Sequence, residues 1–126
     1  MPVNVSIVPC LDYSSENVRR ALSAALEPLG GLDWVGPGMT VAIKTNLVSG
    51  MKPESAAVTH PALLAALTEE LRARGARVVV GDSPGGPWTA AWVRSVYHGT
   101  GMEAVEAARG ELYGDFGETE GTFAQG

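Results

Sequence analysis

The chain has 126 residues, of which 45% are hydrophobic and 18% charged, a composition that fits one folded domain and excludes intrinsic disorder. Its formal net charge of −5 at pH 7 argues against a general nucleic-acid binder, because such proteins need a basic face to displace counterions. The single cysteine, Cys10, excludes an intrachain disulfide and a four-cysteine iron–sulfur cluster in these residues.

The first part of the chain predicts a strand followed by a helix. Apolar and polar residues alternate over residues 3–8, which is the pattern of a strand with one buried face, and Pro9 ends it. Ser14 or Ser15 can cap the helix that follows, and its apolar residues recur at helical spacing until Gly30. The order therefore begins as β-α.

The middle of the chain predicts a second strand and a second helix. The strand covers residues 39–43 and is followed directly by Lys44, Thr45 and Asn46. After a loop, Pro61 marks the first residue of a helix, with Thr59 or His60 as its cap.

The last part predicts two further strands around helical segments. Residues 77–80 are β-branched for the most part and indicate a buried strand, which the glycine-rich segment 81–86 ends. Thr89 can cap a third helix, another helical segment covers residues 102–109, and a short strand is predicted at residues 111–113.

This β-α-β-α-β-α-β order predicts an α/β fold, namely a parallel-rich sheet with helices on both faces. We expect one α/β domain over residues 1–116, as the N-terminal portion of a larger domain. Residues 117–126 form a polar, glycine-rich tail, which we expect to be frayed or to need a partner that is missing here.

Ligands of open parallel sheets bind outside the carboxyl ends of the strands, so polar residues there are the candidates for a site. The candidate ligand-binding residues are Lys44, Asn46, His60, Asp82, Ser83, Gly85 and Gly86. Lys44 is the most informative, because a lysine after an apolar strand can bind a phosphate or carboxylate; alternatively, it pairs with Asp82.

The other candidates each have a structural alternative. Asn46 can contact a ligand or close its own turn. The segment 81–86 can present backbone N–H groups to an anion beside a helix N-terminus, or it can be a plain turn. His60 can act as a general acid or base, or it can cap a helix. No metal site is expected, because only His60 and Asp82 suggest themselves as ligands.

Three segments together resemble the DUF362 family, and they lie in the same order along the chain. They are Ile43-Lys44-Thr45-Asn46-Leu47, Thr59-His60-Pro61 and Val80-Gly81-Asp82-Ser83-Pro84-Gly85-Gly86. Thr45 stands where the family commonly has proline, and Val58 where it commonly has threonine. The resemblance implies an uncharacterised protein. Many longer members carry cysteine-rich segments that bind [4Fe–4S] clusters, so we expect no cofactor within this chain and a cluster only in those longer members.

The sequence predicts a ligand-binding α/β domain for an anionic small molecule or a nucleotide-like cofactor, redox-linked in longer members. A non-catalytic structural or interaction module is the alternative, and whether the chain is an enzyme stays open. The expected partners are a small anionic ligand and either a second copy or a missing C-terminal domain. We expect no nucleic acid and no membrane, because no apolar run approaches the roughly 20 residues of a membrane span and no signal peptide opens the chain. These expectations place the protein in the cytoplasm.

Overall fold

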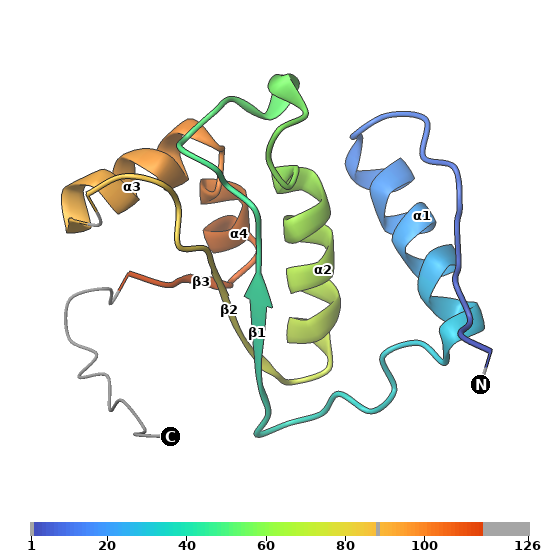
Figure 1. Ribbon diagram of the computed structural model, residues 1–126. Coiled ribbons are helices and arrows are strands. Elements are labelled where there is room, and N and C mark those ends of the chain that lie inside the picture. Colours follow the sequence, from blue (N-terminus) through green and yellow to red (C-terminus); the bar gives the residue numbers. More distant parts are fainter. Residues whose placement is uncertain (1, 88, 115–126) are drawn as a thin grey trace, which may run out of the picture.

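The computed structural model describes residues 2–87 and 89–114, and it confirms an α/β fold with a parallel sheet (Figure 1). Its elements in chain order are α1 (Ser15–Leu26), the 3-10 turn η1 (Glu27–Leu29), β1 (Thr40–Lys44), the 3-10 turn η2 (Pro53–Ser55), α2 (Pro61–Ala73), β2 (Arg77–Gly81), α3 (Ala90–Gly99), α4 (Glu103–Ala107) and β3 (Glu111–Leu112). The predicted tail at residues 117–126 lies outside the described residues.

The three strands lie in the order β1-β2-β3, and both pairs are parallel. In the register of the first pair, Ala42 lies beside Val79, and Lys44 beside Gly81. Because the strands are parallel, their carboxyl ends meet at the same edge of the sheet. The residues that follow β1 and β2 are therefore brought together, as the sequence predicts.

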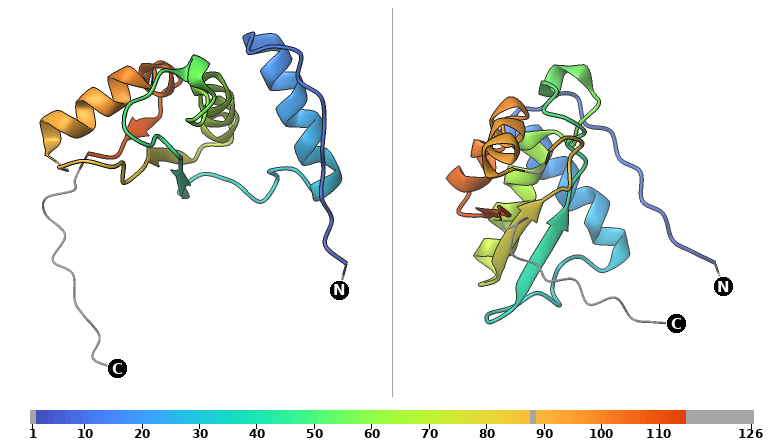
Figure 2. Two further views of the ribbon diagram at one scale, coloured as in Figure 1. Left: turned by 45° about the horizontal axis from the view of Figure 1, so that its top comes forward. Right: turned by 60° about the vertical axis from the view of Figure 1, so that its left-hand side comes forward.

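The described helices cover one face of the sheet rather than both (Figure 2). The strands are added in sequence order in one direction, so each right-handed crossover returns its helix to the same face. Helix α1 packs against α2 and not on the opposite face. The other face therefore carries no helix from the described part of the chain.

The first predicted strand, at residues 3–8, is not a strand in the structure. The segment is extended but pairs with no strand, and the side chains of Val3, Val5 and Ile7 are 85%, 77% and 90% exposed. An alternating pattern indicates that a segment has one apolar face, but it does not show that a neighbouring strand is there to pair with. The prediction of a strand at residues 3–8 is wrong for this reason. Cys10, two residues after this segment, is exposed.

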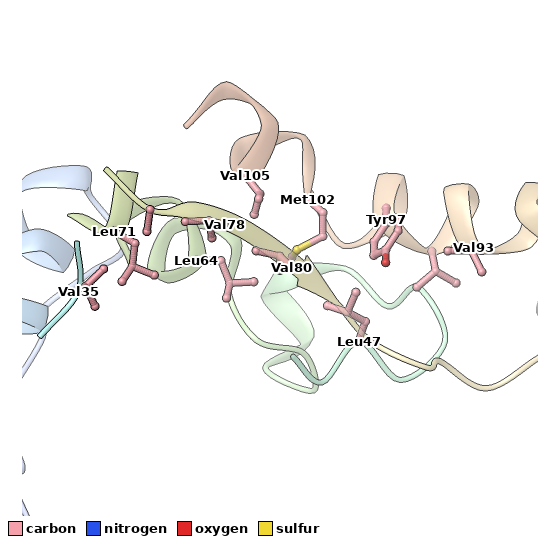
Figure 3. Packing of buried hydrophobic residues seen from close by; sticks show 12 residues of the cluster. Val35, Leu47, Leu64, Leu71, Val78, Val80, Val93, Tyr97, Met102 and Val105 are labelled. Carbon is pink, nitrogen blue, oxygen red and sulfur yellow. The ribbon is translucent and has the colours of Figure 1, made fainter. Parts of the chain in front are cut away.

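The core lies between β2 and the helices behind it (Figure 3). Val78 and Val80 of β2 are at most 1% exposed, and Leu64 of α2 is 2% exposed. Twelve buried residues form this cluster: Val35, Leu47, Leu64, Leu71, Ala76, Val78, Val80, Val93, Val96, Tyr97, Met102 and Val105. This core fixes β2 in the middle of the sheet and thereby positions the segment that follows it.

Three predicted helix caps are confirmed. The hydroxyl of Ser14 accepts a hydrogen bond from the Asn17 amide, and that of Thr89 accepts one from the Trp92 amide. The Nδ1 atom of His60 accepts a hydrogen bond from the Ala62 amide at 3.1 Å. Each cap satisfies an N–H group that the first helical turn would otherwise leave unpaired.

Candidate functional site

An ion pair between Lys44 and Asp82 lies at the carboxyl ends of β1 and β2. Lys44 is the last residue of β1, and Asp82 directly follows β2. The Nζ atom of Lys44 donates to Oδ1 of Asp82 and, at 2.6 Å, to the carbonyl oxygen of Thr45. The Lys44 side chain is 69% exposed and that of Asp82 only 6%. The pairing that the sequence left as an alternative for Lys44 is therefore present.

Asp82 also accepts two backbone hydrogen bonds. The amide of Leu47 donates to Oδ2 at 2.7 Å, and the amide of Ser83 donates to Oδ1 at 2.8 Å. Burial raises the pKa of Asp82, but the hydrogen bonds from Lys44, Leu47 and Ser83 outweigh it and hold the pKa below its ordinary value. Asp82 is therefore an ionised carboxylate that ties the ends of both strands together.

A shallow hollow of about 310 Å³ lies beside this ion pair, on the sheet face without helices. Its lining residues are Ala42, Ile43, Lys44, Val79, Gly81, Asp82, Ser83 and Tyr113. Of the seven candidate residues, the structure brings Lys44, Asp82 and Ser83 to this hollow. Asn46, His60, Gly85 and Gly86 do not line it.

Asn46 closes a loop. Its amide donates to the Thr59 hydroxyl at 3.0 Å, and its carbonyl oxygen accepts from the Thr59 amide at 2.9 Å. Its side-chain nitrogen donates to the carbonyl oxygen of Ala57 at 3.2 Å. These bonds hold the two ends of the loop at residues 47–58 together. Their partners are Ala57 and Thr59 and not the neighbouring backbone, so Asn46 closes a longer loop than the turn expected of it.

His60 lies at the start of α2, where it caps the helix and stacks on Tyr13. The two ring centroids are 3.5 Å apart and the rings are 5° from parallel. Burial lowers the pKa of His60, while Glu54 opposes that shift. The neutral ring is the form that can accept the Ala62 amide at Nδ1. His60 is thus held in the capping role that the sequence offered as its alternative.

The glycine-rich segment 81–86 is shaped by Trp92 of α3. The indole Nε1 of Trp92 donates to the carbonyl oxygen of Gly85 at 2.8 Å, and the Gly85 amide donates to the carbonyl oxygen of Val48 at 2.7 Å. Gly86 has a φ of +126°, and a Cβ built on it would lie 2.2 Å from the Trp92 Nε1. Packing against the indole therefore requires glycine at this position.

Ala42, Val79 and Tyr113 also line the hollow, although they are not among the residues that the sequence predicts for a site. The signal was present in part: Ala42 and Val79 are two residues before Lys44 and Gly81, and side chains two apart on a strand share a face. Tyr113 could not be found in this way, because its position depends on where β3 joins the sheet.

The described residues contain no group of three or more histidine, cysteine, aspartate and glutamate side chains that could hold a metal ion. Within residues 2–87 and 89–114, every helix is too short or too polar to cross a membrane.

The described residues form an α/β protein with a parallel sheet. A lysine–aspartate pair lies at the carboxyl ends of two neighbouring strands. The chain belongs to the DUF362 family, described as a domain of unknown function, whose model matches residues 41–125. It is 34% identical over 85 residues to the thylakoid-associated protein sll1697 of Synechocystis. This alignment spans 67% of the chain but only 26% of that relative. No solved structure matches the chain.

Proposed function

We propose that this chain is a ligand-binding α/β domain that takes an anionic small molecule or a nucleotide-like cofactor at the hollow beside Lys44. The observation that supports the proposal most is the position of Lys44, which lines the hollow and whose side chain is 69% exposed although its partner Asp82 is buried. An ammonium group has three donors, and Asp82 and the Thr45 carbonyl account for two of them. The third N–H group leaves one hydrogen bond that Lys44 can donate to an anionic ligand.

Ser83 supports the same interpretation. It is exposed, it lines the hollow, and it directly follows Asp82 at the end of β2. A hydroxyl can donate to an anion and accept from a protonated one. Lys44 and Ser83 together therefore supply a cation and a hydrogen-bonding group at the place where parallel sheets commonly bind ligands.

The proposed site consists of these residues, and the proposed location of the protein is the cytoplasm. Where a longer member of the family has a [4Fe–4S] segment, we propose that the ligand bound here takes part in redox chemistry at that cluster. The single cysteine of this chain cannot supply the four thiolates of such a cluster.

The test is a titration of wild type and of Lys44→Met with phosphate, sulfate and a nucleotide, followed by thermal shift and by amide chemical shifts. Methionine keeps much of the apolar stem of lysine and removes its charge. Lys52→Met is the matched control, because Lys52 is the other lysine of the chain and does not line the hollow. Binding that is lost in Lys44→Met and kept in Lys52→Met is expected. Equal binding by all three proteins would contradict the proposal.

An interaction module is the second candidate function, and exposed apolar residues favour it. Val3, Val5, Ile7 and Leu11 are between 77% and 90% exposed, and one sheet face has no helix in the described part of the chain. Large exposed apolar surface often marks a contact with another protein or subunit. Light scattering over a wide range of concentration tests this candidate with wild type and Ile7→Ser. A monomer at every concentration would count against self-association.

A further inference from the structure

The floor of the hollow beside Lys44 is apolar and flat. Ala42 and Val79 lie side by side in the register of β1 and β2, on the same face as Lys44. Ala42 is exposed and Val79 is half-buried. Their short side chains cover the sheet without projecting far from it, so an extended planar group can lie against both strands.

Tyr113 forms a wall of this hollow. Its side chain is placed close to Gly81, since a Cβ built on Gly81 would lie 2.8 Å from the Cβ of Tyr113. The tyrosine is 41% exposed, and its backbone oxygen accepts a hydrogen bond from the hydroxyl of Tyr97. These contacts fix the backbone and the Cβ of Tyr113 beside the floor, and its aromatic ring supplies apolar surface to a ligand in the hollow.

The charge of the hollow is nearly balanced. Asp82 is ionised and directly contacts the ammonium group of Lys44. A small inorganic anion would meet a cation whose field is largely cancelled by this carboxylate, and it would gain nothing from the apolar floor. Strong binding therefore requires a ligand that combines the charge contact with burial of apolar surface.

Resting on the proposed function, we infer that the ligand is an aromatic carboxylate: a flat apolar ring that carries one anionic group. Its ring lies on Ala42 and Val79 and against Tyr113. Its carboxylate accepts a hydrogen bond from the remaining N–H group of Lys44, and the Ser83 hydroxyl lies beside it. The ring supplies most of the affinity, and the charge contact fixes the orientation.

The experiment compares 2-naphthoate, acetate and 2-naphthol in titrations of the full chain, with methyl groups of alanine and valine observed by NMR. We expect 2-naphthoate to bind at least about tenfold more tightly than either acetate or 2-naphthol, which corresponds to about 1.4 kcal/mol. The methyl signals of Ala42 and Val79 should shift. Lys44→Met should reduce the affinity for 2-naphthoate to that for 2-naphthol.

Ala42→Gln provides the second variant, because a longer polar side chain on this exposed position covers the floor without entering the core. Thr40→Gln is its matched control: Thr40 is also exposed, lies on the same face two residues earlier and does not line the hollow. Binding of 2-naphthoate should be lost in Ala42→Gln and kept in Thr40→Gln.

The outcomes separate this inference from the function on which it rests. If acetate and 2-naphthoate bind equally tightly, and both need Lys44, the anion site stands and the aromatic ligand is wrong. If 2-naphthoate binds equally well to wild type, Lys44→Met and Ala42→Gln, the ring binds elsewhere and the inference is overturned. If phosphate, the nucleotide and the carboxylates all fail to bind, the proposed function itself is wrong.

Discussion

Replacing Asp82 by asparagine tests whether this carboxylate ties β1 and β2 together. Asparagine has nearly the same shape, but only one of its two terminal atoms accepts hydrogen bonds. In the wild type, both carboxylate oxygens accept: Oδ1 from Lys44 and Ser83, and Oδ2 from Leu47. In Asp82→Asn, an NH₂ group replaces one of the two carboxylate oxygens, so the donors that this oxygen accepted from meet another donor.

The magnitude follows from which partner is left unpaired. Leu47 is fully buried, so its amide cannot turn to water, and an unpaired buried donor costs about 1–3 kcal/mol. Lys44 adds little, since its side chain is 69% exposed and exposed ion pairs contribute about 0–1 kcal/mol. We expect Asp82→Asn to lower the free energy of unfolding at pH 7 by about 1–3 kcal/mol.

The loss should depend on pH with a definite sign. The pKa of Asp82 is lower in the folded chain than its ordinary value, so its contribution to stability is complete above the unfolded pKa of about 3.9. The contribution disappears as the pH falls through the lower, folded pKa. The difference in stability between wild type and Asp82→Asn should therefore be constant from about pH 7 to 5 and shrink below about pH 4.

The assay is urea denaturation followed by circular dichroism at a series of pH values. Asp33→Asn is the control, because Asp33 also pairs with a basic residue, Arg74, but its side chain is 92% exposed. It should change stability by no more than about 0.5 kcal/mol. Equal stability of Asp82→Asn and wild type at pH 7 would refute the role given to Asp82.

Two further substitutions test the glycine-rich segment and the α2 cap. Gly86→Ala should lower the free energy of unfolding by about 2 kcal/mol or more, because the Cβ of alanine would overlap the Trp92 indole. Gly30 has a φ of +93° and nothing within 4 Å of a Cβ built on it. Gly30→Ala should therefore lower the free energy of unfolding by only about 1 kcal/mol, through backbone strain alone. Equal losses in urea denaturation would exclude the overlap. For His60, burial lowers the pKa, so wild-type stability should decline as the pH falls from about 6.5 towards the lower folded pKa. That decline should be smaller in His60→Asn, which still caps the helix, and parallel pH profiles of unfolding would contradict this explanation.

The meeting of Lys44 and Asp82 could be predicted from the sequence, because parallel strands end at one edge of a sheet. The caps at Ser14, His60 and Thr89 could also be predicted, since each is a local hydrogen bond between residues close in the chain. Local patterns and the direction of the strands therefore account for much of the candidate site.

The rest depends on tertiary packing that the sequence pattern does not record. Residues 3–8 have the alternation of a strand but no neighbouring edge. Asn46 could be assigned to its loop only once Thr59 was seen beside it. The covered face of the sheet follows from the order of the strands in space, and Tyr113 reaches the hollow only because β3 joins beside β2.

The bonds between Asn46 and Thr59 have a consequence for how this protein can be altered. They fasten the base of the loop at residues 47–58, and the Gly85 amide holds its first part through the carbonyl oxygen of Val48. Met51 and Lys52 at the tip of the loop are exposed, and doubling the length of a flexible loop adds only about 0.6 kcal/mol to the entropy of closing it. A peptide epitope or a reporter grafted between these two residues would therefore leave the strand register and the Lys44–Asp82 pair in place.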